Sequence, residues 1–538
     1  MVDRLSDDSE PSTRIEWLLA ALPPLIYALL ILLWARNAPF WDDYEAILSR
    51  LLVIDGPDGW RTLGESNNEH LVVTTTVAAW LDRYLFGVLD FRHLIWLGNL
   101  ALLASFTMLS RGLPAVTTAL AGVTLFNFSY WEGNLWAMTA VSHYLAILLP
   151  LTAFVCLQHG WGLWPAVLAA LLSALSQANG MLVWPIGALW LAWERRWADL
   201  SVWMIGFGLT LITYRHLSAS GAVPQASWMD LGAFFVAFMG GLAGASWPAL
   251  VLGALVLLAF LVYGVGGDWK YRPVPLLIML FLLGTAIAAT LRRAPFGFEI
   301  ALSSRYAIIS SFMLAALVAG FRPVGRELWW VVGAVLAANI ALAAKVYPQL
   351  EHRKQRLAMF PSEALVGCVD RYNHPDPVNA ARSYEHAVRA GWLALPLPQT
   401  RCQDWGLQVL VNPAPQALLV GEAGHIDYRQ VFGSRLRLDG WMPLRADDKD
   451  VVLYLASSDT PTTRLLRRQP RADISAMLGS DLYYYSGFSL ILDFADEASA
   501  LRASQSICLA VVSHKHPPSL VAGSPEHCRA FLKTGKTT

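Results

Sequence analysis

The sequence is short of charge. Only 15% of its 538 residues are Asp, Glu, Lys or Arg, whereas 55% are apolar, and acidic and basic residues balance at a formal net charge of zero. Soluble domains carry about 25% charged residues, and domains that bind nucleic acid carry an excess of basic ones. The composition therefore argues against both classes, and it predicts a polytopic helical membrane protein with no nucleic-acid partner.

Several motifs of soluble enzymes are also missing. The chain contains no GxxxxGK[ST] loop, no GxGxxG pattern between a strand and a helix, no HExxH and no GxSxG. These patterns hold phosphates, bind zinc or expose a nucleophilic serine. Nucleotide hydrolysis, zinc proteolysis and serine hydrolysis therefore have no support.

Cysteine is scarce, and no pair has the CxxC spacing that is typical of zinc sites. Cys156 falls in a long apolar run, whereas the other four, Cys368, Cys402, Cys508 and Cys528, lie in the last third of the chain. An even set predicts two disulfides in an oxidising compartment, with three possible connectivities. Proximity in the sequence favours pairing Cys368 with Cys402 and Cys508 with Cys528.

Long apolar runs are what the sequence does have, throughout residues 15–346. The first, at 17–35, is long enough to cross a bilayer, and the polar residues 1–14 before it lack the basic start of a cleaved signal peptide. We predict a retained anchor with a cytoplasmic N-terminus, kinked at Pro23-Pro24. Later runs bring the prediction to about eleven crossings; they lie near residues 94–110, 112–130, 139–158, 162–177, 181–193, 200–214, 249–265, 273–291, 305–321 and 327–346.

Basic residues set the predicted orientation. With the N-terminus inside, most basic flanks of the spans fall on the cytoplasmic side, as the positive-inside tendency requires: Arg111, Arg195, Arg196, Lys270, Arg272, Arg322 and Arg326. The first loop, residues 36–92, then faces outward. This map requires residues 231–246 to dip into the membrane or lie flat, since a full crossing would reverse every later segment.

The tail has a different composition. Charge, Pro and Asn return after residue 346, and residues 347–411 are predicted to be a mixed helical and extended connector. Residues 412–538 contain short segments of alternating polarity between turn residues, which predicts a small β-sandwich. With eleven crossings, both parts are extracytoplasmic.

Two acidic points in the first loop are the main candidates for chemistry. Asp42 and Asp43 stand between aromatic residues shortly after the first apolar run, and Glu69 and His70 precede an amphipathic segment of the same loop. Carboxylates and an imidazole at one membrane surface can supply a general base or hold a divalent cation. The alternative is that these acids are only solvated loop charges.

Arginines on the predicted outer side need a reason, because the positive-inside tendency disfavours them there. Arg292 and Arg293 close one predicted span, and Arg305 and Tyr306 open the next. Guanidinium groups match phosphate oxygens, so a lipid phosphate is one explanation. Snorkelling toward lipid headgroups is the other.

Other polar residues at predicted span ends are weaker candidates for contact with a sugar or an acceptor: Glu132, Asn134, Gln177 and Asn179. His143, within a predicted span, is interpreted as a helix-packing residue rather than a ligand. Tryptophans near predicted span ends, namely Trp131, Trp136, Trp184 and Trp228, are interpreted as part of the interfacial aromatic belt.

These residues together resemble the GT-C superfamily of integral membrane glycosyltransferases over roughly residues 15–346. The resemblance lies in one N-terminal span, an outer loop that opens with Trp41-Asp42-Asp43-Tyr44, a second acidic point at Asn68-Glu69-His70, many later spans and a soluble outer tail. Stretches 176–184 and 301–306 also look like those of bacterial members that modify O-antigen, pilin or cell-wall glycans. Leu71 departs from the pattern, because related sequences often have Arg there.

The resemblance implies a bacterial inner-membrane hexosyl- or pentosyltransferase with its C-terminal domain in the periplasm. The donor would be a sugar on polyprenyl phosphate, and the acceptor a glycan or a protein. Asp42 or Asp43 would be the general base of inverting transfer.

The resemblance also implies roles for the remaining residues. Glu69 and His70 would orient the acceptor or help to hold a cation, Mg²⁺ or Mn²⁺, although the sequence does not establish any cofactor. Arg305, with Arg292 or Arg293, would stabilise the departing lipid phosphate.

Two other classes of function stay open. A transporter or flippase of lipid-linked sugars predicts ionisable groups at span centres and paired broken helices, but the sequence has no internal repeat. A non-catalytic scaffold predicts that the acidic loop is only solvated.

Overall fold

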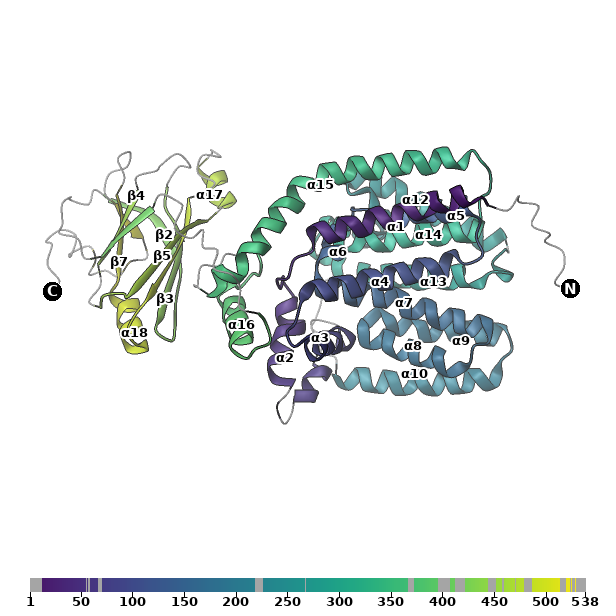
Figure 1. The fold of residues 1–538 in the computed structure, drawn as a ribbon, viewed down its shortest axis with the longest axis horizontal. Helices are drawn as coiled ribbons and strands as arrows, with labels where there is room; N and C mark the ends of the chain where they lie inside the picture. The colour runs from purple at the N-terminus through teal and green to yellow at the C-terminus, as the bar shows by residue number, and fades with distance from the viewer. Residues whose placement is uncertain are drawn as a thin grey trace. The chain divides into compact units, whose positions relative to one another are not determined.

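The computed structural model divides the chain into two compact units, of which unit 1 is helical and unit 2 is built around strands (Figure 1). Unit 1 comprises Met1–Ala358 and Ala387–Ala394, and unit 2 comprises Met359–His386 and Leu395–Thr538. The structure describes residues 12–54, 56, 59–65, 70–217, 226–266, 268–365, 372–394, 407–411, 421–443, 451–456, 459–469, 471–478, 486–512, 519–522, 524 and 528.

Unit 1 is a bundle of long apolar helices with short elements across one end. Its described α-helices are α1 (Arg14–Trp34), α2 (Ser49–Ile54), α3 (Val73–Phe86), α4 (Phe91–Ser110), α5 (Ala115–Leu125), α6 (Trp131–Leu135), α7 (Ala137–His159), α8 (Leu163–Ser176), α9 (Val183–Trp193), α10 (Trp197–Leu217), α11 (Trp228–Met239), α12 (Ser246–Gly266), α13 (Pro273–Arg293), α14 (Ala307–Phe321) and α15 (Leu328–Leu365).

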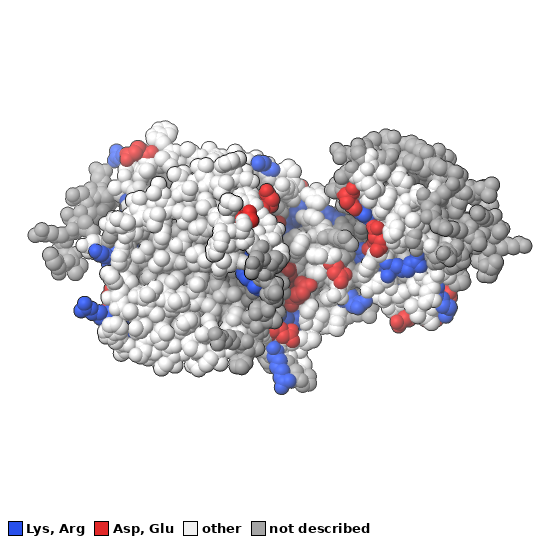
Figure 2. All heavy atoms as spheres, turned by 180° about the vertical axis from the view of Figure 1, so that it is seen from behind, with Lys and Arg blue, Asp and Glu red and all other residues white. Residues whose placement is uncertain are grey.

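Seven helical segments among the described residues are long and apolar enough to cross a membrane. They lie in α1, α4, α7, α12, α13, α14 and α15, and α5, α8 and α11 are shorter apolar helices. Figure 2 shows that most of the unit 1 surface on the displayed face carries no charged side chain. The predicted class, a polytopic helical protein, is thus confirmed at this level.

The first predicted span is helix α1, and its start is well capped. The Thr13 hydroxyl accepts a hydrogen bond from the Glu16 amide, and the Glu16 carboxylate accepts one from the Thr13 amide. This reciprocal capping box satisfies donors that the first helical turn leaves open. The helix continues without interruption through Pro23 and Pro24.

One end of the bundle, here named the site end, brings the predicted outer loops together. The backbone amide of Met138, at the start of α7, donates to the carboxylate of Asp43, which lies beyond the end of α1. The hydroxyl of Ser304, just before α14, donates to Glu132 in α6. These contacts place the first loop at the same end as the α6–α7 and α13–α14 connections.

The opposite end carries the basic flanks. Arg322, at the end of α14, donates to the backbone carbonyl of Gly112 beyond α4. Arg196 donates to the carbonyl of Leu157 near the end of α7. The chain therefore alternates between a basic end and the site end, as a polytopic protein requires.

Helix α11 lies beside the site end. Its 12 residues extend only about 18 Å, and it contacts the short turns Ala294–Phe296 and Phe298–Leu302 that join α13 to α14. Gly240, which follows α11, approaches α12 so closely that an added Cβ would lie 1.9 Å from the Ala249 carbonyl oxygen. Close backbone packing of small residues thus fixes α11 against α12.

Helix α15 crosses the predicted start of the tail without a break. It has 38 residues and continues past Ala358, where unit 1 ends along this helix. The later segment Ala387–Ala394 belongs to unit 1 again, because the carbonyl of Trp392 accepts a hydrogen bond from the Leu89 amide. The guanidinium of Arg83 stacks 3.4 Å from the centroid of the Trp392 ring.

Unit 2 contains one described mixed sheet of eight strands in the order β1-β4-β7-β8-β2-β3-β6-β5. The strands are β1 (Leu407–Val411), β2 (Gly421–Phe432), β3 (Arg435–Trp441), β4 (Val451–Ala456), β5 (Thr463–Gln469), β6 (Gly487–Asp493), β7 (Cys508–Val512) and β8 (Ser519–Ala522). Helices α16 (Pro377–Arg389), of which the last residues belong to unit 1, α17 (Ala472–Met477) and α18 (Glu497–Ser506) accompany it.

The predicted β-sandwich is corrected in two respects. The described strands form one sheet rather than two, and its outermost strands β1 and β5 also approach each other, so the sheet is strongly curled. Strand β1 lies in the predicted connector. Two parallel pairs, β1 with β4 and β2 with β8, join segments far apart in the sequence, which alternation of polarity within a strand does not reveal.

The core of unit 2 lies between this sheet and α18. Leu436 and Leu438 of β3, Leu490 of β6 and Ala500 and Ala503 of α18 are buried together. Burial of these alternate strand positions on one face explains their apolar character.

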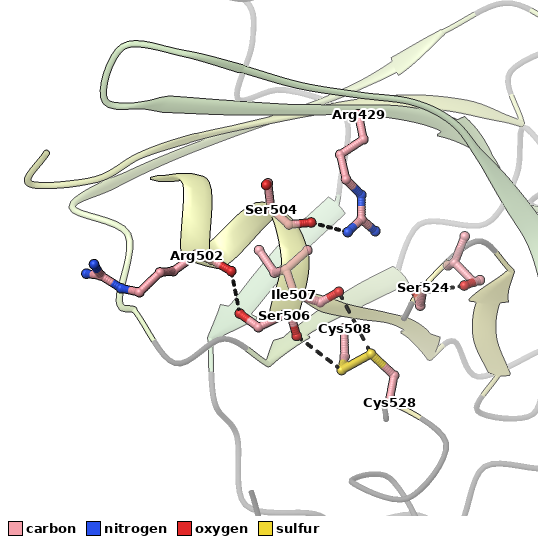
Figure 3. Close-up of a disulfide and its surroundings, with 9 residues drawn as sticks. Arg429, Arg502, Ser504, Ser506, Ile507, Cys508, Ser524 and Cys528 are labelled. Carbon is pink, nitrogen blue, oxygen red and sulfur yellow. Dashed lines mark hydrogen bonds between the residues drawn. A yellow bond between two sulfur atoms is a disulfide. The ribbon is translucent and has the colours of Figure 1, made fainter. Parts of the chain in front are cut away.

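A disulfide fixes the end of unit 2. Cys508, at the start of β7, is bonded to Cys528, with 5.4 Å between their Cα atoms (Figure 3). Figure 3 also shows Arg429 of β2 donating to the carbonyl of Ser504 in α18. The predicted Cys508–Cys528 pair is confirmed, whereas Cys368 and Cys402 lie outside the described residues.

Candidate functional site

The acidic stretch of the first loop has an unusual backbone. Trp41 is in the left-handed region with φ of 47°, a conformation that residues other than glycine adopt rarely. Immediately after Asp43 the chain forms a π-helical turn, Tyr44–Leu48, before α2 begins. Both features are uncommon and concentrate at functional sites. The backbone of this stretch therefore marks it as a candidate site independently of its charge.

Asp43 is a buried residue that holds the loop against α7. Its Oδ1 accepts from the Met138 amide at 2.8 Å, its Oδ2 accepts from the Phe40 amide at 2.9 Å, and the residue is 1% exposed. Met138 is the second residue of α7, where a free amide and the helix dipole favour a carboxylate. Both oxygens of Asp43 therefore have structural partners.

Burial raises the pKa of Asp43 from its ordinary value of 3.8 to about 7, although its two backbone hydrogen bonds and the charge of Arg353 act in the opposite direction. Its neighbour Asp42 is only partly buried. The two adjacent acids thus have different surroundings, and Asp42 is the one with access to solvent.

The second acidic point is described only in part, because Glu69 lies outside the described residues. His70 is described, and its Nδ1 accepts a hydrogen bond from the Ala178 amide at 3.2 Å, beyond α8. Val72 has a φ of 47°, which a β-branched residue rarely adopts. The strained positions of the first loop therefore flank both predicted acidic points.

Arg50 of α2 anchors the segment that carries His70. The guanidinium donates to the carbonyl of Leu71 at 2.8 Å and to the carbonyl of Glu65 at 2.7 Å, and the residue is 4% exposed. Because these carbonyls flank His70, one planar cation fixes both sides of the loop.

A cavity of about 140 Å³ lies at the site end of the bundle. Its polar lining gathers seven of the predicted site residues and two others, and no carboxylate stands among the described lining residues. Ala146, Ile147, Phe238, Ile308 and Ile309 are among its apolar wall residues. The predicted residues in the lining are His70, Gln177, Asn179, Arg292, Arg293, Arg305 and Tyr306, and the further polar ones are His143 and Thr285.

Helix ends deliver these side chains. Arg292 and Arg293 close α13, and Arg305 lies in the turn Ser304–Tyr306 that leads into α14. The Nε of Arg305 is buried and has no hydrogen-bond partner among the described residues, and its guanidinium lies 5.2 Å from the Tyr306 ring centroid. An open buried donor beside two more guanidinium groups favours an anion in the cavity.

Amide side chains complete the wall. Gln177 donates to the Ser142 hydroxyl at 3.2 Å, and the Asn179 amide nitrogen donates to the Thr285 hydroxyl at 3.1 Å. The Asn179 Oδ1 is buried and without a hydrogen-bond partner among the described residues. Amide and cationic groups at one end of an apolar cavity suit the polar head of an amphipathic ligand.

Glu132 and Asn134 are placed beside the cavity rather than in its lining. Glu132 accepts from the Ser304 hydroxyl at 2.6 Å and so positions the residue before Arg305. Asn134 is fully buried, where its Oδ1 accepts from the hydroxyls of Tyr27 and Tyr144. Asn134 is therefore a helix-packing residue in this structure, and it has no exposed surface to offer a sugar.

His143 and Arg353 are site residues that the sequence did not single out. His143 was interpreted as a packing residue, but it lines the cavity with His70. Arg353 is 2% exposed in α15, with its guanidinium 3.9 Å from the Phe40 ring centroid. The position of His143 near the start of a span was an available signal, whereas nothing local marks Arg353.

A divalent cation has little support from the described residues. They contain no group of three or more His, Cys, Asp or Glu side chains close enough to hold a metal ion. Asp43 directs both carboxylate oxygens to backbone amides. Among the described acids of the first loop, Asp43 is therefore engaged by the backbone rather than turned toward a cation.

Comparisons with models of protein families, with curated proteins and with solved structures give no match for this chain. The chemical interpretation of the site therefore rests on its own residues.

Proposed function

We propose that this protein is a membrane glycosyltransferase that takes its sugar from a polyprenyl-phosphate-linked donor. The observation that carries the proposal is the cavity at the site end, which is lined by Arg292, Arg293, Arg305, His70 and His143 and by no carboxylate of the described part of the chain. Guanidinium groups bind phosphate oxygens through paired, charge-assisted hydrogen bonds. Residues of the apolar helices α7, α13 and α14 line this cavity, which suits a phosphate attached to a lipid.

The wider setting belongs to the proposal. Eleven crossings are obtained when α5, α8, α9 and α10 are counted with the seven long apolar segments and α11 is left at the site end. The N-terminus and the basic end then face the cytoplasm. The site end and the tail face the periplasm of a bacterial cell, where the acceptor is a surface glycan or a protein such as pilin.

Asp42 is the proposed general base. It would remove the proton of an acceptor hydroxyl while the hydroxyl oxygen bonds to the anomeric carbon of the donor sugar. The bond from that carbon to the phosphate oxygen breaks, its electron pair leaves with the lipid phosphate, and the anomeric centre is inverted. Arg305, with Arg292 and Arg293, would stabilise the charge that develops on the departing phosphate.

The test separates donor binding from transfer. Polyprenyl phosphate is the binding probe for protein in nanodiscs, and mass spectrometry of surface glycans and pilin from cells with and without the protein reports transfer. We expect Arg305→Ala to weaken probe binding by about 10-fold or more, because a charged hydrogen bond is lost. Arg195→Ala, an exposed arginine at the basic end, is the matched control and leaves binding unchanged.

Asp42→Asn tests the chemical step. We expect it to retain probe binding and to lower transfer by about 10²-fold or more, the scale of general-base catalysis. Equal probe binding by wild type and Arg305→Ala would overturn the donor site. Unchanged glycans in cells that express folded Asp42→Asn would overturn the role of this base, and movement of the lipid-linked sugar without any transfer would favour a flippase.

A further inference from the structure

Arg353 is a buried cation that touches the acidic loop from another helix. It belongs to α15, and its Nη2 donates to the carbonyl of Leu135 at 3.2 Å. The guanidinium carbon lies 3.9 Å from the Phe40 ring centroid and 5.9 Å from that of Trp131. Arginine is almost never buried to this degree without such partners.

Arg353 contacts both chain segments that donate hydrogen bonds to Asp43, one at Phe40 and one next to Met138. Phe40 donates its own amide to the Asp43 carboxylate. Leu135 ends α6, directly before α7, which supplies the other donor, Met138. Arg353 therefore holds the two segments whose amides bind Asp43, and its charge opposes the effect of burial by lowering the pKa of this carboxyl.

Arg353 lies on helix α15, near the point where this helix passes the end of unit 1. Helix α15 is unbroken for 38 residues, about 57 Å. Unit 1 ends along it at Ala358, shortly after Arg353. The charge of Arg353 lowers the pKa of the Asp43 carboxyl, and that of Asp42 raises it. The helix that leaves the bundle thus carries the cation that faces the acidic loop.

We propose that Arg353 is a positioning residue that braces the loop bearing Asp42 and Asp43 against α15 and the start of α7. Its planar guanidinium fills the space between two aromatic rings and a carbonyl, and no other cationic side chain offers the same stacking surface. The catalytic consequence rests on the proposed function. The contacts of Arg353 with the loop are a property of the fold, and their effect on stability is measurable without any substrate.

The first experiment compares Arg353→Gln and Arg353→Lys with Lys354→Gln. Lys354 is the matched control, because it is the adjacent cation of α15 and pairs with Glu351 at 3.6 Å on a more exposed part of the helix. We expect Arg353→Gln to lower transfer about 10-fold or more per folded molecule, because small displacements of a catalytic group are costly. Polyprenyl phosphate affinity should stay within about 2-fold, since Arg353 is not among the cavity residues.

Arg353→Lys keeps the charge but loses the stacked plane, so its transfer should lie between those of wild type and Arg353→Gln. Equal loss of transfer and of probe affinity would show a general defect of folding and overturn the specific role. Transfer by Arg353→Gln that matches Lys354→Gln would overturn it as well.

The second experiment is a double-mutant cycle on thermal stability, which needs no substrate. Arg353→Gln and Asp43→Asn are measured singly and together by the Tm of the purified full chain, with Arg353→Lys in place of the glutamine variant if that one does not fold. Residues in one network give non-additive effects, so the double variant should lose less than the sum of the single losses. If the Tm losses of the two single variants add strictly, the positioning role of Arg353 is overturned even if sugar transfer is confirmed. A non-additive cycle in a protein that neither binds polyprenyl phosphate nor alters glycans would preserve the brace and reject the proposed function.

Discussion

The carboxylate of Asp43 accepts a hydrogen bond from the backbone amide of Met138, 95 residues further along the chain. This bond fastens the loop after the first span to the start of α7. The two adjacent acids differ in burial, because Asp43 is enclosed whereas Asp42 keeps access to solvent. An acidic pair that looks uniform in the sequence is thus one buried residue and one partly buried residue.

The stability of the protein should depend on pH through Asp43. Its pKa rises from 3.8 in the unfolded chain to about 7 in the folded one, so the folded state binds more protons between these values. The free energy of unfolding should therefore fall as pH rises from about 4 to about 7, by at most about 1.4 kcal/mol per pH unit. Thermal unfolding in detergent across this range measures the effect.

Asp43→Asn cannot titrate at this position and supplies the comparison. Its Tm should change less with pH than that of wild type across the same window. Parallel curves for the two proteins would show that Asp43 does not ionise in this range.

The packing of α11 should tolerate no side chain at Gly240. A Cβ there would lie 1.9 Å from the Ala249 carbonyl oxygen, whereas one at Gly232 within α11 meets nothing within 4 Å. We expect Gly240→Ala to cost about 1 to 3 kcal/mol through overpacking. Gly232→Ala should be neutral or slightly stabilising. Equal melting temperatures of the two variants would contradict the close approach of α11 and α12.

A buried polar network should stabilise the bundle. The Tyr27 hydroxyl in α1 lies 2.5 Å from the Asn99 Oδ1 in α4 and 2.7 Å from the Asn134 Oδ1 in α6. Such bonds between membrane helices contribute about 1 kcal/mol, so Tyr27→Phe should lower the free energy of unfolding by that amount. Tyr271→Phe, at an exposed position, is the control, and an equally small effect of both would argue against the network.

The disulfide should matter to unit 2 more than to unit 1. Cys508 and Cys528 close a chain segment with a sequence separation of 20, for which loss of the bond costs about 3 kcal/mol. The double variant Cys508→Ser with Cys528→Ser should make the tail more sensitive to limited proteolysis. Wild type in reducing agent should behave in the same way, and resistance in both cases would contradict the prediction.

Much of the bundle follows from local properties of the sequence. Apolar length predicts α1, α4 and α7, because no other element satisfies its own backbone inside lipid. The cavity residues Arg292, Arg293 and Arg305 were recognisable because cations at the unexpected end of a span need an anionic partner. These arguments use position along a helix, which a sequence contains.

What the sequence does not contain is the pairing of distant segments. The burial of Asp43 depends on Met138, and the environment of Phe40 depends on Arg353, which no periodicity of either segment reveals. The curled sheet of unit 2 has the same cause, since its parallel pairs join remote strands. The sequence likewise does not place His143 in the cavity lining, because a histidine in a span has the same local pattern whether it packs or lines a cavity.

The left-handed backbone at Trp41 costs stability, but a tryptophan there also keeps the chain before Asp42 stiffer than glycine would. A residue with a Cβ loses on the order of 1 kcal/mol in this conformation, and glycine would recover most of that strain. Glycine would also loosen the chain directly before Asp42. A laboratory selection for heat resistance alone should therefore exchange this tryptophan for glycine, whereas a selection for the proposed sugar transfer should retain it.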